Sequence, residues 1–563
     1  MNKRILRFAN LTACNACLWM TILCSSSSLA GTLQGWTVDP LVKLLRNAPV
    51  GNEREATADA ARGETATFQL VVRSDLPIHG LRCEVGDFRG EGDSPAIKGA
   101  ISRFVGYVPV VNLMGHPPKD AVGIAKGDYP DPLLEDPTVD VKAGDAQPVW
   151  VTIKIPLDTE PRDYHASAKV IAGTDVIEFP LTLHVYAAKV VKTRLWVTNW
   201  FQRDIGYDPM PAHNTPQFWE MLRLYARDMA AHRQNVARTV PLELAQYTYD
   251  TNARMSVDFS RMDQWIQIFI DEGVIGRIEG QQFAWRGGKW DSPYVVSTYV
   301  VDNGKTVEKR VAPTSPEAIQ FYSQFLPLLQ KHIEQRGWLK IWFQHIGDEP
   351  ADNNADSYLQ VRALVKKYAP RLHVMDALLT KKVAPQIDLL VPILDQFHHH
   401  FDYYKNLQSA GKELWFYTCG GPQWEYANRM IQIPLIKTRL LPWIDFRYGA
   451  TGYLHWGYNF WKRDPDPKKV IEAAYGAGRP DVVAGDAWVV YPKRNGLGVI
   501  DSIRWEAQRD GCEDHELLSQ LAERNPDAAH ELAATQILDF NSYQTDITAF
   551  RKTHRELLLL LSR

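Results

Sequence analysis

The most informative stretch of this chain is Ile341-Trp342-Phe343-Gln344-His345-Ile346-Gly347-Asp348-Glu349-Pro350. Its first six residues are apolar enough to form a buried strand, and Gly347 and Pro350 are residues that end such an element. Two adjacent acids, Asp348 and Glu349, follow the strand directly. Polar residues at the carboxyl end of a buried strand are typical of the sites of parallel α/β enzymes. This stretch therefore predicts both a strand and a place for chemistry.

Similar strand-like stretches recur on either side of it and alternate with helical patterns. The predicted strands lie at residues 194–200, 235–240, 277–285, 339–346, 372–378, 388–394, 413–419 and 452–456. The predicted helices lie between most of them, at residues 216–232, 258–271, 316–335, 356–368 and 433–446. Eight strands in a segment of this length predict a (β/α)8 TIM-type barrel. A doubly wound open sheet is the alternative, but no GxGxxG motif follows a strand here.

The regions before and after this segment have a different character. Short β-rich runs broken by turn residues occur at residues 67–72, 104–110, 149–155 and 181–185, which favours an antiparallel sandwich. The last residues contain one hairpin-like piece at 488–491 and then polar helices. We therefore expect a β-sandwich domain over 31–190, the barrel over 191–480, and an extension over 481–563 that packs on the barrel.

The first thirty residues are typical of an export signal. Lys3, Arg4 and Arg7 precede an apolar run over residues 11–23, and Ser28-Leu29-Ala30 provides a small-x-small cleavage pattern. No later segment approaches about 20 consecutive apolar residues. We therefore predict an exported protein, periplasmic or secreted, without an integral membrane segment after removal of the signal.

The composition excludes several classes of function. Lys and Arg number 63 against 66 Asp and Glu, a net charge of −3 that does not favour a general nucleic-acid binder. The cysteines left after the signal, Cys83, Cys419 and Cys512, lack CxxC spacing and indicate neither a disulfide framework nor a zinc site, although one pairing among them stays open. The 18 Trp, 23 Tyr and 20 Phe fit large cores or a sugar-binding cleft, and composition does not decide between the two.

The two acids after the fourth strand have two interpretations. Acids favour a helix N-terminus, so Asp348 and Glu349 could simply cap the next helix. The functional interpretation is a glycosidase acid with an assisting neighbour. A retaining glycosidase with a covalent intermediate needs a second carboxylate about 5 Å from the acid. The seventh strand ends without one, since Glu413 lies at its start and Glu425 lies well into the following loop.

A missing nucleophile and an adjacent acid pair fit substrate assistance, in which the sugar's own 2-acetamido oxygen attacks the anomeric carbon. We assign Asp348 to orienting the acetamido group and its oxazolinium form, and Glu349 to protonating the leaving oxygen and then activating water. Glu349 then needs a raised pKa, which the charge of its neighbour helps to supply. A conventional two-carboxylate retaining glycosidase with Glu425 as nucleophile is the alternative.

Several motifs resemble those of glycoside hydrolase family 123, and together they span nearly all of the mature chain. They are Trp342 to Pro350, Leu414-Trp415-Phe416-Tyr417-Thr418-Cys419, the helix end with Arg439, Trp443 and Tyr448-Gly449, Gly452-Tyr453-Leu454-His455-Trp456, Gly485-Asp486, Tyr491-Pro492, Ser502-Ile503-Arg504, Arg509-Asp510-Gly511, Pro130-Asp131-Pro132-Leu133 and Gln147-Pro148-Val149-Trp150. The resemblance implies an exo-acting β-N-acetylgalactosaminidase that uses the substrate-assisted mechanism. Cys512 departs from the pattern, which has an aliphatic residue there.

Further residues near the predicted strand ends are candidates for substrate binding. Tyr417 could donate its hydroxyl to the acetamido oxygen, or belong to the core. Trp456 and Trp461 flank the eighth strand and could stack on a sugar face or plug the top of the barrel. Asn459 could bind a sugar hydroxyl or terminate a turn.

Two more candidates come from other strands. Trp200 ends the first strand and is a candidate for the pocket. His345 lies three residues before Asp348, where it could tune the acid pair or be a satisfied core histidine.

The sequence predicts no metal and no cofactor. His398, His399 and His400 cannot all face one ion, because neighbours on a strand alternate sides, and no HxH motif lies on the first strand. No GxSxG, P-loop or HExxH motif occurs either. The expected partner is a carbohydrate with a terminal 2-acetamido sugar, whose galacto or gluco configuration stays open. The alternative outside enzymes is a carbohydrate-binding or scaffold protein with an inactive barrel.

Overall fold

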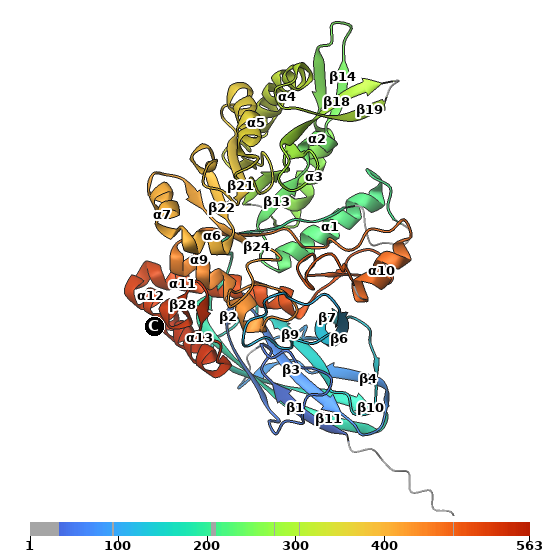
Figure 1. Cartoon of the computed structure of the whole chain (residues 1–563). Coiled ribbons are helices and arrows are strands. Elements are labelled where there is room, and N and C mark those ends of the chain that lie inside the picture. The colour runs from blue at the N-terminus through green and yellow to red at the C-terminus, as the bar shows by residue number, and fades with distance from the viewer. Residues whose placement is uncertain (1–32, 93–94, 204–209, 275, 303–304, 477) are drawn as a thin grey trace, which may run out of the picture.

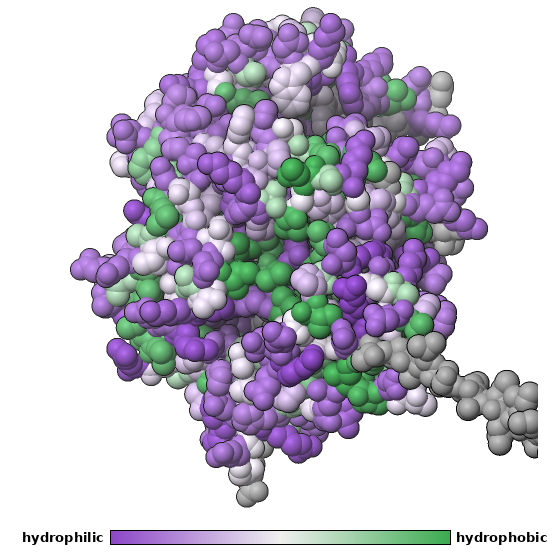
Figure 2. Space-filling model, turned by 60° about the horizontal axis from the view of Figure 1, so that its bottom comes forward, coloured by the Kyte–Doolittle hydropathy of each residue, from purple (hydrophilic) through white to green (hydrophobic). Residues whose placement is uncertain are grey.

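The computed structural model describes residues 33–563 apart from 93–94, 204–209, 275, 303–304 and 477, so the predicted signal at 1–30 lies outside the described residues. The chain forms an N-terminal region made mostly of sheet, an α/β region and a C-terminal segment that contacts both (Figure 1). Among the described helices, none is long and apolar enough to cross a membrane. The face turned toward the viewer in Figure 2 is mainly hydrophilic, with a group of apolar residues near its middle.

The N-terminal region contains two sheets that pack face to face. The first has the order β1 (Gln34–Val38), β3 (Thr65–Arg73), β9 (Gln147–Lys154), β6 (Ile101–Val110) and β7 (Gly127–Leu134). The second has the order β2 (Ala56–Arg62), β11 (Asp175–Lys189), β10 (Asp163–Ala172), β4 (Ile78–Val85) and β8 (Val139–Val141), with β5 (Arg89–Gly90) paired to β10.

Alternation along the strands explains the layered packing. Phe179, Leu181, Leu183 and Val185 are buried at every second position of β11, as expected for a strand with one face in a core. Three of the strand runs predicted here lie within strands of the two sheets, and the run over 149–155 extends one residue past the end of β9. The pairing differs from the prediction at one place, since β11 pairs with β2 in parallel.

The α/β region contains parallel strands at every one of the eight predicted places. They are β12 (Trp196–Asn199), β13 (Val236–Thr239), β16 (Arg277–Gly280), β20 (Trp342–Gln344), β21 (His373–Leu378), β22 (Leu389–Pro392), β23 (Glu413–Leu414) with β24 (Phe416–Thr418), and β25 (Gly452–His455). They form a six-stranded sheet, β13-β16-β20-β21-β22-β23, and a three-stranded sheet, β12-β25-β24. The two sheets are separate in hydrogen-bonding pattern, so a closed (β/α)8 barrel stays a prediction.

Two helices of this region begin directly after a residue whose side chain caps the helix N-terminus. The α1 helix (Pro216–Ala231) starts after Thr215, whose hydroxyl accepts from the Phe218 N–H, and α4 (Pro316–Gln335) starts after Ser315 in the same way. The others are α3 (Ser260–Asp271), α5 (Ala355–Tyr368), α6 (Leu394–His399), α7 (Phe401–Ser409), α8 (Leu435–Arg439) and α9 (Leu441–Tyr448). The single helix predicted over 433–446 is two helices, because Pro442 has no N–H to continue the first.

Two β insertions leave the predicted pattern. The first is a hairpin of β14 (Gln246–Tyr249) and β15 (Met255–Asp258), after the short helix α2 (Pro241–Leu244). The second is a sheet of β17 (Ala284–Arg286), β18 (Tyr294–Asp302) and β19 (Lys305–Val311). The strand predicted over 277–285 therefore stops at Gly280, and its last residues belong to this separate sheet.

The C-terminal segment lies between the two larger regions (Figure 1). It contains α10 (Pro467–Tyr475), β26 (Tyr491–Pro492) with β27 (Val499–Ile500), α11 (Ile503–Arg524), α12 (Pro526–Gln536), β28 (Ile537–Asp539) with β29 (Ser542–Tyr543), and α13 (Ile547–Ser562). The α11 helix packs against α8, α9 and β7, whereas α13 packs against β11. The segment therefore contacts the sheet region as well as the α/β region on which it was expected to pack.

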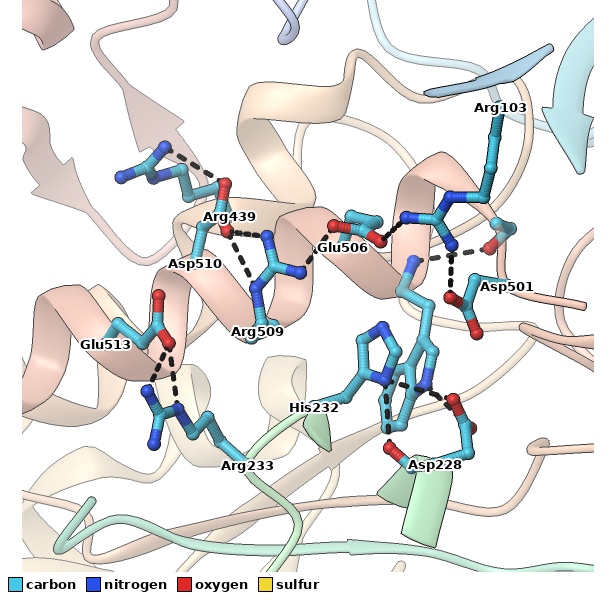
Figure 3. A network of polar contacts seen from close by, with 12 residues as sticks. Arg103, Asp228, His232, Arg233, Arg439, Asp501, Glu506, Arg509, Asp510 and Glu513 are labelled. Carbon is cyan, nitrogen blue, oxygen red and sulfur yellow. Dashed lines mark hydrogen bonds and ion pairs between the residues drawn. The ribbon is translucent and has the colours of Figure 1, made fainter. Parts of the chain in front are cut away.

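The α11 helix is polar in sequence and yet almost entirely buried. Its charged side chains face partners from other elements: Glu506 pairs with Arg103 of β6, and Glu513 pairs with Arg233, just after α1 (Figure 3). Because buried charges need partners, these ion pairs explain how a polar helix occupies an interior position.

Candidate active site

A cavity of about 870 Å³ opens at the carboxyl ends of the parallel strands. Residues that follow β12, β20, β24 and β25 contribute to its wall, together with the β17–β19 insertion and the C-terminal segment. Five of the predicted site residues line it, namely Trp200, Asp348, Glu349, Tyr417 and Trp456. The structure thus gathers residues that are more than 250 positions apart along the sequence.

The acid pair sits in a tight turn directly after β20. A Cβ on Gly347 would lie 2.8 Å from the ring of Tyr294, so only glycine fits beneath that ring. The Tyr294 hydroxyl donates to the backbone carbonyl of Asp348 at 2.5 Å. Glu349 has a φ of 50°, a left-handed conformation that costs free energy for a residue with a side chain. The surrounding packing therefore holds both carboxyl groups at the cavity at some energetic cost.

Burial governs the ionisation of the pair. Burial first, and the charge of Asp348 second, raise the pKa of Glu349 to about 7. Burial also raises the pKa of Asp348, although Arg286, His345 and Arg238 oppose that shift. The pair can therefore hold one proton near neutrality, as two interacting carboxyls do, and Glu349 is suited to giving and taking that proton.

Two side chains from other elements lie near the acid pair. The Tyr417 hydroxyl, at the end of β24, donates to the Glu349 carboxyl. Asp486, from the C-terminal segment, lines the same cavity and accepts from Trp456 Nε1 at 2.9 Å. Burial raises the pKa of Asp486 to about 6. In this structure Tyr417 therefore positions Glu349, and the carboxyl group of Asp486 also faces the cavity.

A buried charge network lies beneath the cavity. His345 is fully buried, with Nδ1 2.8 Å from Asp376 and Nε2 2.6 Å from Glu279. Burial opposes a charge on His345, but these two acids outweigh it and raise the pKa to about 9. Glu279 also accepts from Trp200 Nε1 at 2.5 Å. The two acids thus favour the charged form of His345, which lies beneath the site and does not itself line the cavity.

Two other predicted binding residues do not line the cavity. Trp461 is buried, and its Nε1 donates to the Val490 carbonyl, which makes it a core residue in this structure. The Asn459 side chain makes two hydrogen bonds to the backbone of Gln202 and ties two loops together.

Glu425 also lies elsewhere. It is partly exposed, accepts from the Lys119 N–H and lies 3.5 Å from Lys437 Nζ. The geometry therefore gives no support to Glu425 as a nucleophile in this cavity.

Cys419 lines the cavity, whereas His398 and the other two described cysteines lie outside it. His398 contacts the Tyr426 hydroxyl and stacks on Phe540, at the packing surface of the C-terminal segment. Cys83, Cys419 and Cys512 are free thiols. Within the described residues, the two groups that could hold a metal ion, Glu64-Asp514-His554 and Asp228-His232-Asp501, lie outside the cavity.

Sequence reasoning missed several residues that line the cavity. Arg238 is the last residue but one of β13, and its position near a strand end was a usable signal. Asp486 belongs to a motif in the C-terminal segment whose place in space the sequence does not reveal. Trp285, Arg286 and Trp290 belong to the unpredicted β insertion.

Comparisons with known proteins point to one family. The catalytic domain of glycoside hydrolase 123 matches residues 189–521, and the glycoside hydrolase 123 N-terminal domain matches residues 43–172. No curated protein matches the chain.

Among solved structures, a family 123 glycoside hydrolase from Clostridium perfringens, described for glycolipid glycan hydrolysis, is 16% identical. The match covers 94% of this chain and 97% of that chain with a TM-score of 0.72, so the two share a fold. A β-glucuronidase from Bacteroides uniformis (12% identity, 79% and 50% covered, TM-score 0.29) and an endo-β-1,4-mannanase from Thermotoga petrophila (11%, 58% and 78%, 0.34) are too distant in structure to carry an argument.

Proposed function

Because the chain belongs to glycoside hydrolase family 123, we propose that it is an exported, exo-acting enzyme that removes terminal β-linked 2-acetamido sugars, N-acetylgalactosamine above all. The observation that carries this proposal is the Asp348-Glu349 pair at the carboxyl end of β20, inside a cavity large enough for a sugar. The pattern of the first thirty residues supports export. The glycolipid glycans named for the Clostridium perfringens relative are the first natural substrates to test.

The mechanism that we propose is substrate-assisted and proceeds with retention. Protonated Glu349 gives its proton to the glycosidic oxygen while the acetamido carbonyl oxygen attacks the anomeric carbon and the aglycone leaves. Asp348 orients the acetamido N–H and stabilises the positive charge of the oxazolinium ring. Glu349, now a carboxylate, then takes a proton from the water that opens this ring. The pKa of about 7 supports this double role, because Glu349 exists in both forms near neutrality.

We also infer that the two parallel sheets are parts of one (β/α)8 barrel. A parallel bridge joins Ile393 to Tyr417, so β22 lies beside β24, and β23 and β24 are separated only by Trp415. On the other side the Asn235 N–H donates to the Val197 carbonyl, between β13 and β12. These contacts support a ring of strands with the cavity at its carboxyl end, where barrel enzymes have their sites.

The test is a panel of chromogenic 2-acetamido and 2-hydroxy glycosides with the purified protein. We expect hydrolysis of the 2-acetamido compounds only, and strong inhibition by a thiazoline analogue of the oxazolinium intermediate. An active preparation that ignores the thiazoline would contradict substrate assistance. Tight sugar binding without any hydrolysis would instead favour a carbohydrate-binding protein.

A further inference from the structure

The outer part of the cavity is rich in arginine and tryptophan. The β17–β19 insertion supplies Trp285, Arg286, Trp290 and Arg310 to its lining, and the loop after β25 supplies Arg463. Trp290 is 55% exposed and lines this part of the cavity. Arg286 places this part of the lining beside the acid pair, because its Nη2 donates to the Glu349 backbone carbonyl at 2.9 Å.

The arginines of this cavity fall into two kinds. Arg203 pairs with Glu243, and Arg310 lies 3.2 Å from Glu308, so an acid compensates each of these charges. Arg463 is exposed, and its Nε lies 3.4 Å from the Gln202 side-chain oxygen, which carries no charge.

Arg286 likewise has no acid within ion-pair distance among the described residues, although it acts on Asp348 and Glu349 at longer range. Its Nε donates to the Trp290 carbonyl at 2.8 Å, and its Nη2 donates to the Glu349 carbonyl at 2.9 Å. Its guanidinium lies 3.6 Å from the centre of the Trp290 ring, which holds the planar group in one orientation. In the part of the chain that the structure describes, neither Arg286 nor Arg463 forms an ion pair.

Arg238 repeats this arrangement at the base of the cavity. It is 8% exposed, its Nη2 donates to Gln282 at 3.0 Å, and its Nε is a buried donor without a partner. Its guanidinium lies 4.1 Å from the Trp200 ring centre. Among the described residues no acid forms an ion pair with Arg238, although Glu279, Asp348 and Glu243 act on it at longer range. A bound anion would offset the remaining cost of burying this group.

We propose that the aglycone side of this cavity binds an acidic sugar, whose carboxylate is held by Arg286 and Arg463 next to the bond that is cleaved. A guanidinium presents a fixed fork of N–H donors that matches a carboxylate, and charge-assisted bonds of this kind are strong. The two cations also offset the repulsion that Asp348, Glu349 and Asp486 would exert on an anionic substrate. This inference rests on the proposed function, since it names the class of glycoside that the same site prefers.

The test uses two disaccharides that differ only in charge. One is N-acetylgalactosamine β-1,4-linked to glucuronic acid, and the other is the same compound with the carboxyl group reduced to an alcohol. We expect kcat/KM to be about tenfold higher for the acidic compound, and the preference to shrink as salt is added. The ratio is measured on one preparation, so it does not depend on the fraction of folded enzyme.

Two variants assign the preference to Arg463, which is exposed and therefore replaceable without loss of the fold. Arg463→Gln should bring the ratio close to one, and Arg463→Lys should keep part of it because the charge remains. Lys289→Gln removes an exposed charge from the same insertion but outside the lining, and should leave both the ratio and the hydrolysis of p-nitrophenyl β-N-acetylgalactosaminide unchanged.

Failure of this inference and failure of the proposed function give different results. If the wild-type enzyme cleaves both disaccharides equally, or the neutral one faster, the acidic subsite is wrong and the glycosidase proposal stands. An unchanged preference in Arg463→Gln would also overturn the role given to that residue. If neither disaccharide nor the p-nitrophenyl glycoside is cleaved, the proposed function itself fails.

Discussion

Two groups of acidic side chains, one at the interface around α11 and one at the cavity, have opposite electrostatic surroundings. At the interface around α11, arginines face the acids: Glu506 lies between Arg103 and Arg509 (Figure 3). Although burial raises the pKa of Glu506, those two arginines outweigh it and lower it to about 2. At the cavity, Glu349 has a tyrosine hydroxyl as its hydrogen-bond donor, and its pKa rises to about 7.

This difference separates a structural use of buried charge from a chemical one. The arginines keep Glu506 ionised, so that it joins two regions of the fold, whereas Glu349 can gain and lose a proton near neutral pH. A raised pKa alone does not mark a site, since burial and Asp228 raise the pKa of Asp501, in the same cluster as Glu506, to about 7. The ionised partners around Glu506 make it unsuited to proton transfer. Among the described residues no cation forms an ion pair with Glu349, and this is therefore the more informative observation about function.

The largest effect is expected from Glu349→Gln. The variant cannot protonate a leaving group, so kcat/KM for natural glycosides should fall about 10³-fold. Aryl glycosides with good leaving groups need little protonation and should lose much less activity in the glycosylation step. Rates on both substrate types check this, and equal losses on the two would contradict the role of Glu349 as the acid.

The second effect is structural and concerns the other cluster. Glu506→Gln leaves Arg103 and Arg509 buried without that carboxylate, which should cost about 3 kcal/mol of unfolding free energy at neutral pH. Because the native pKa of Glu506 lies below its unfolded value, this cost should be present above about pH 4 and disappear as the pH falls toward 2. Urea unfolding across this range measures it. A variant as stable as the wild type at pH 7 would show that the interface does not depend on this acid.

The sequence predicts the cavity residues better than the ion pairs of α11, and the reason is physical. Asp348, Glu349 and Tyr417 follow strands whose apolar runs are visible in the sequence, and parallel strands bring such ends together. Trp461 has the same sequence context but fills the core, because a tryptophan beside a strand end packs equally well inward. Asp486 and Arg286 reach the cavity from a distant segment and from an insertion, and no local pattern encodes that approach. The pairs of α11 are equally hidden, since their partners lie in other elements.

The third prediction concerns the pH dependence of stability at Glu349, which has the opposite sign to that at Glu506. The pKa of Glu349 is about 7 in the native state and near 4.3 in an unfolded chain, so ionisation costs the native state stability as the pH rises between these values. Glu349→Gln should therefore equal the wild type in stability near pH 4 and exceed it by up to about 3 kcal/mol above pH 7. Thermal unfolding at both pH values tests this. A stability difference that does not change with pH would mean that Glu349 is not held protonated by its surroundings.

The smallest effect is expected from Asp486→Asn, and it also tests the remaining mechanism. The charge of Asp486 contributes to the raised pKa of Glu349, so its removal should move the alkaline limb of the kcat/KM profile to lower pH. The amide oxygen of the variant can still accept from Trp456 Nε1. One hydrogen bond to an uncharged partner contributes about 1 kcal/mol, so we expect the rate at the optimum to stay within about tenfold of the wild type. Asp486 is a further carboxyl at the cavity wall, where a covalent nucleophile would have to lie if the acetamido group does not serve. Glu243 also lines the cavity but pairs with Arg203. Loss of activity as complete as in Glu349→Gln, with recovery by added azide, would therefore assign the nucleophile to Asp486 and replace substrate assistance by a two-carboxylate mechanism.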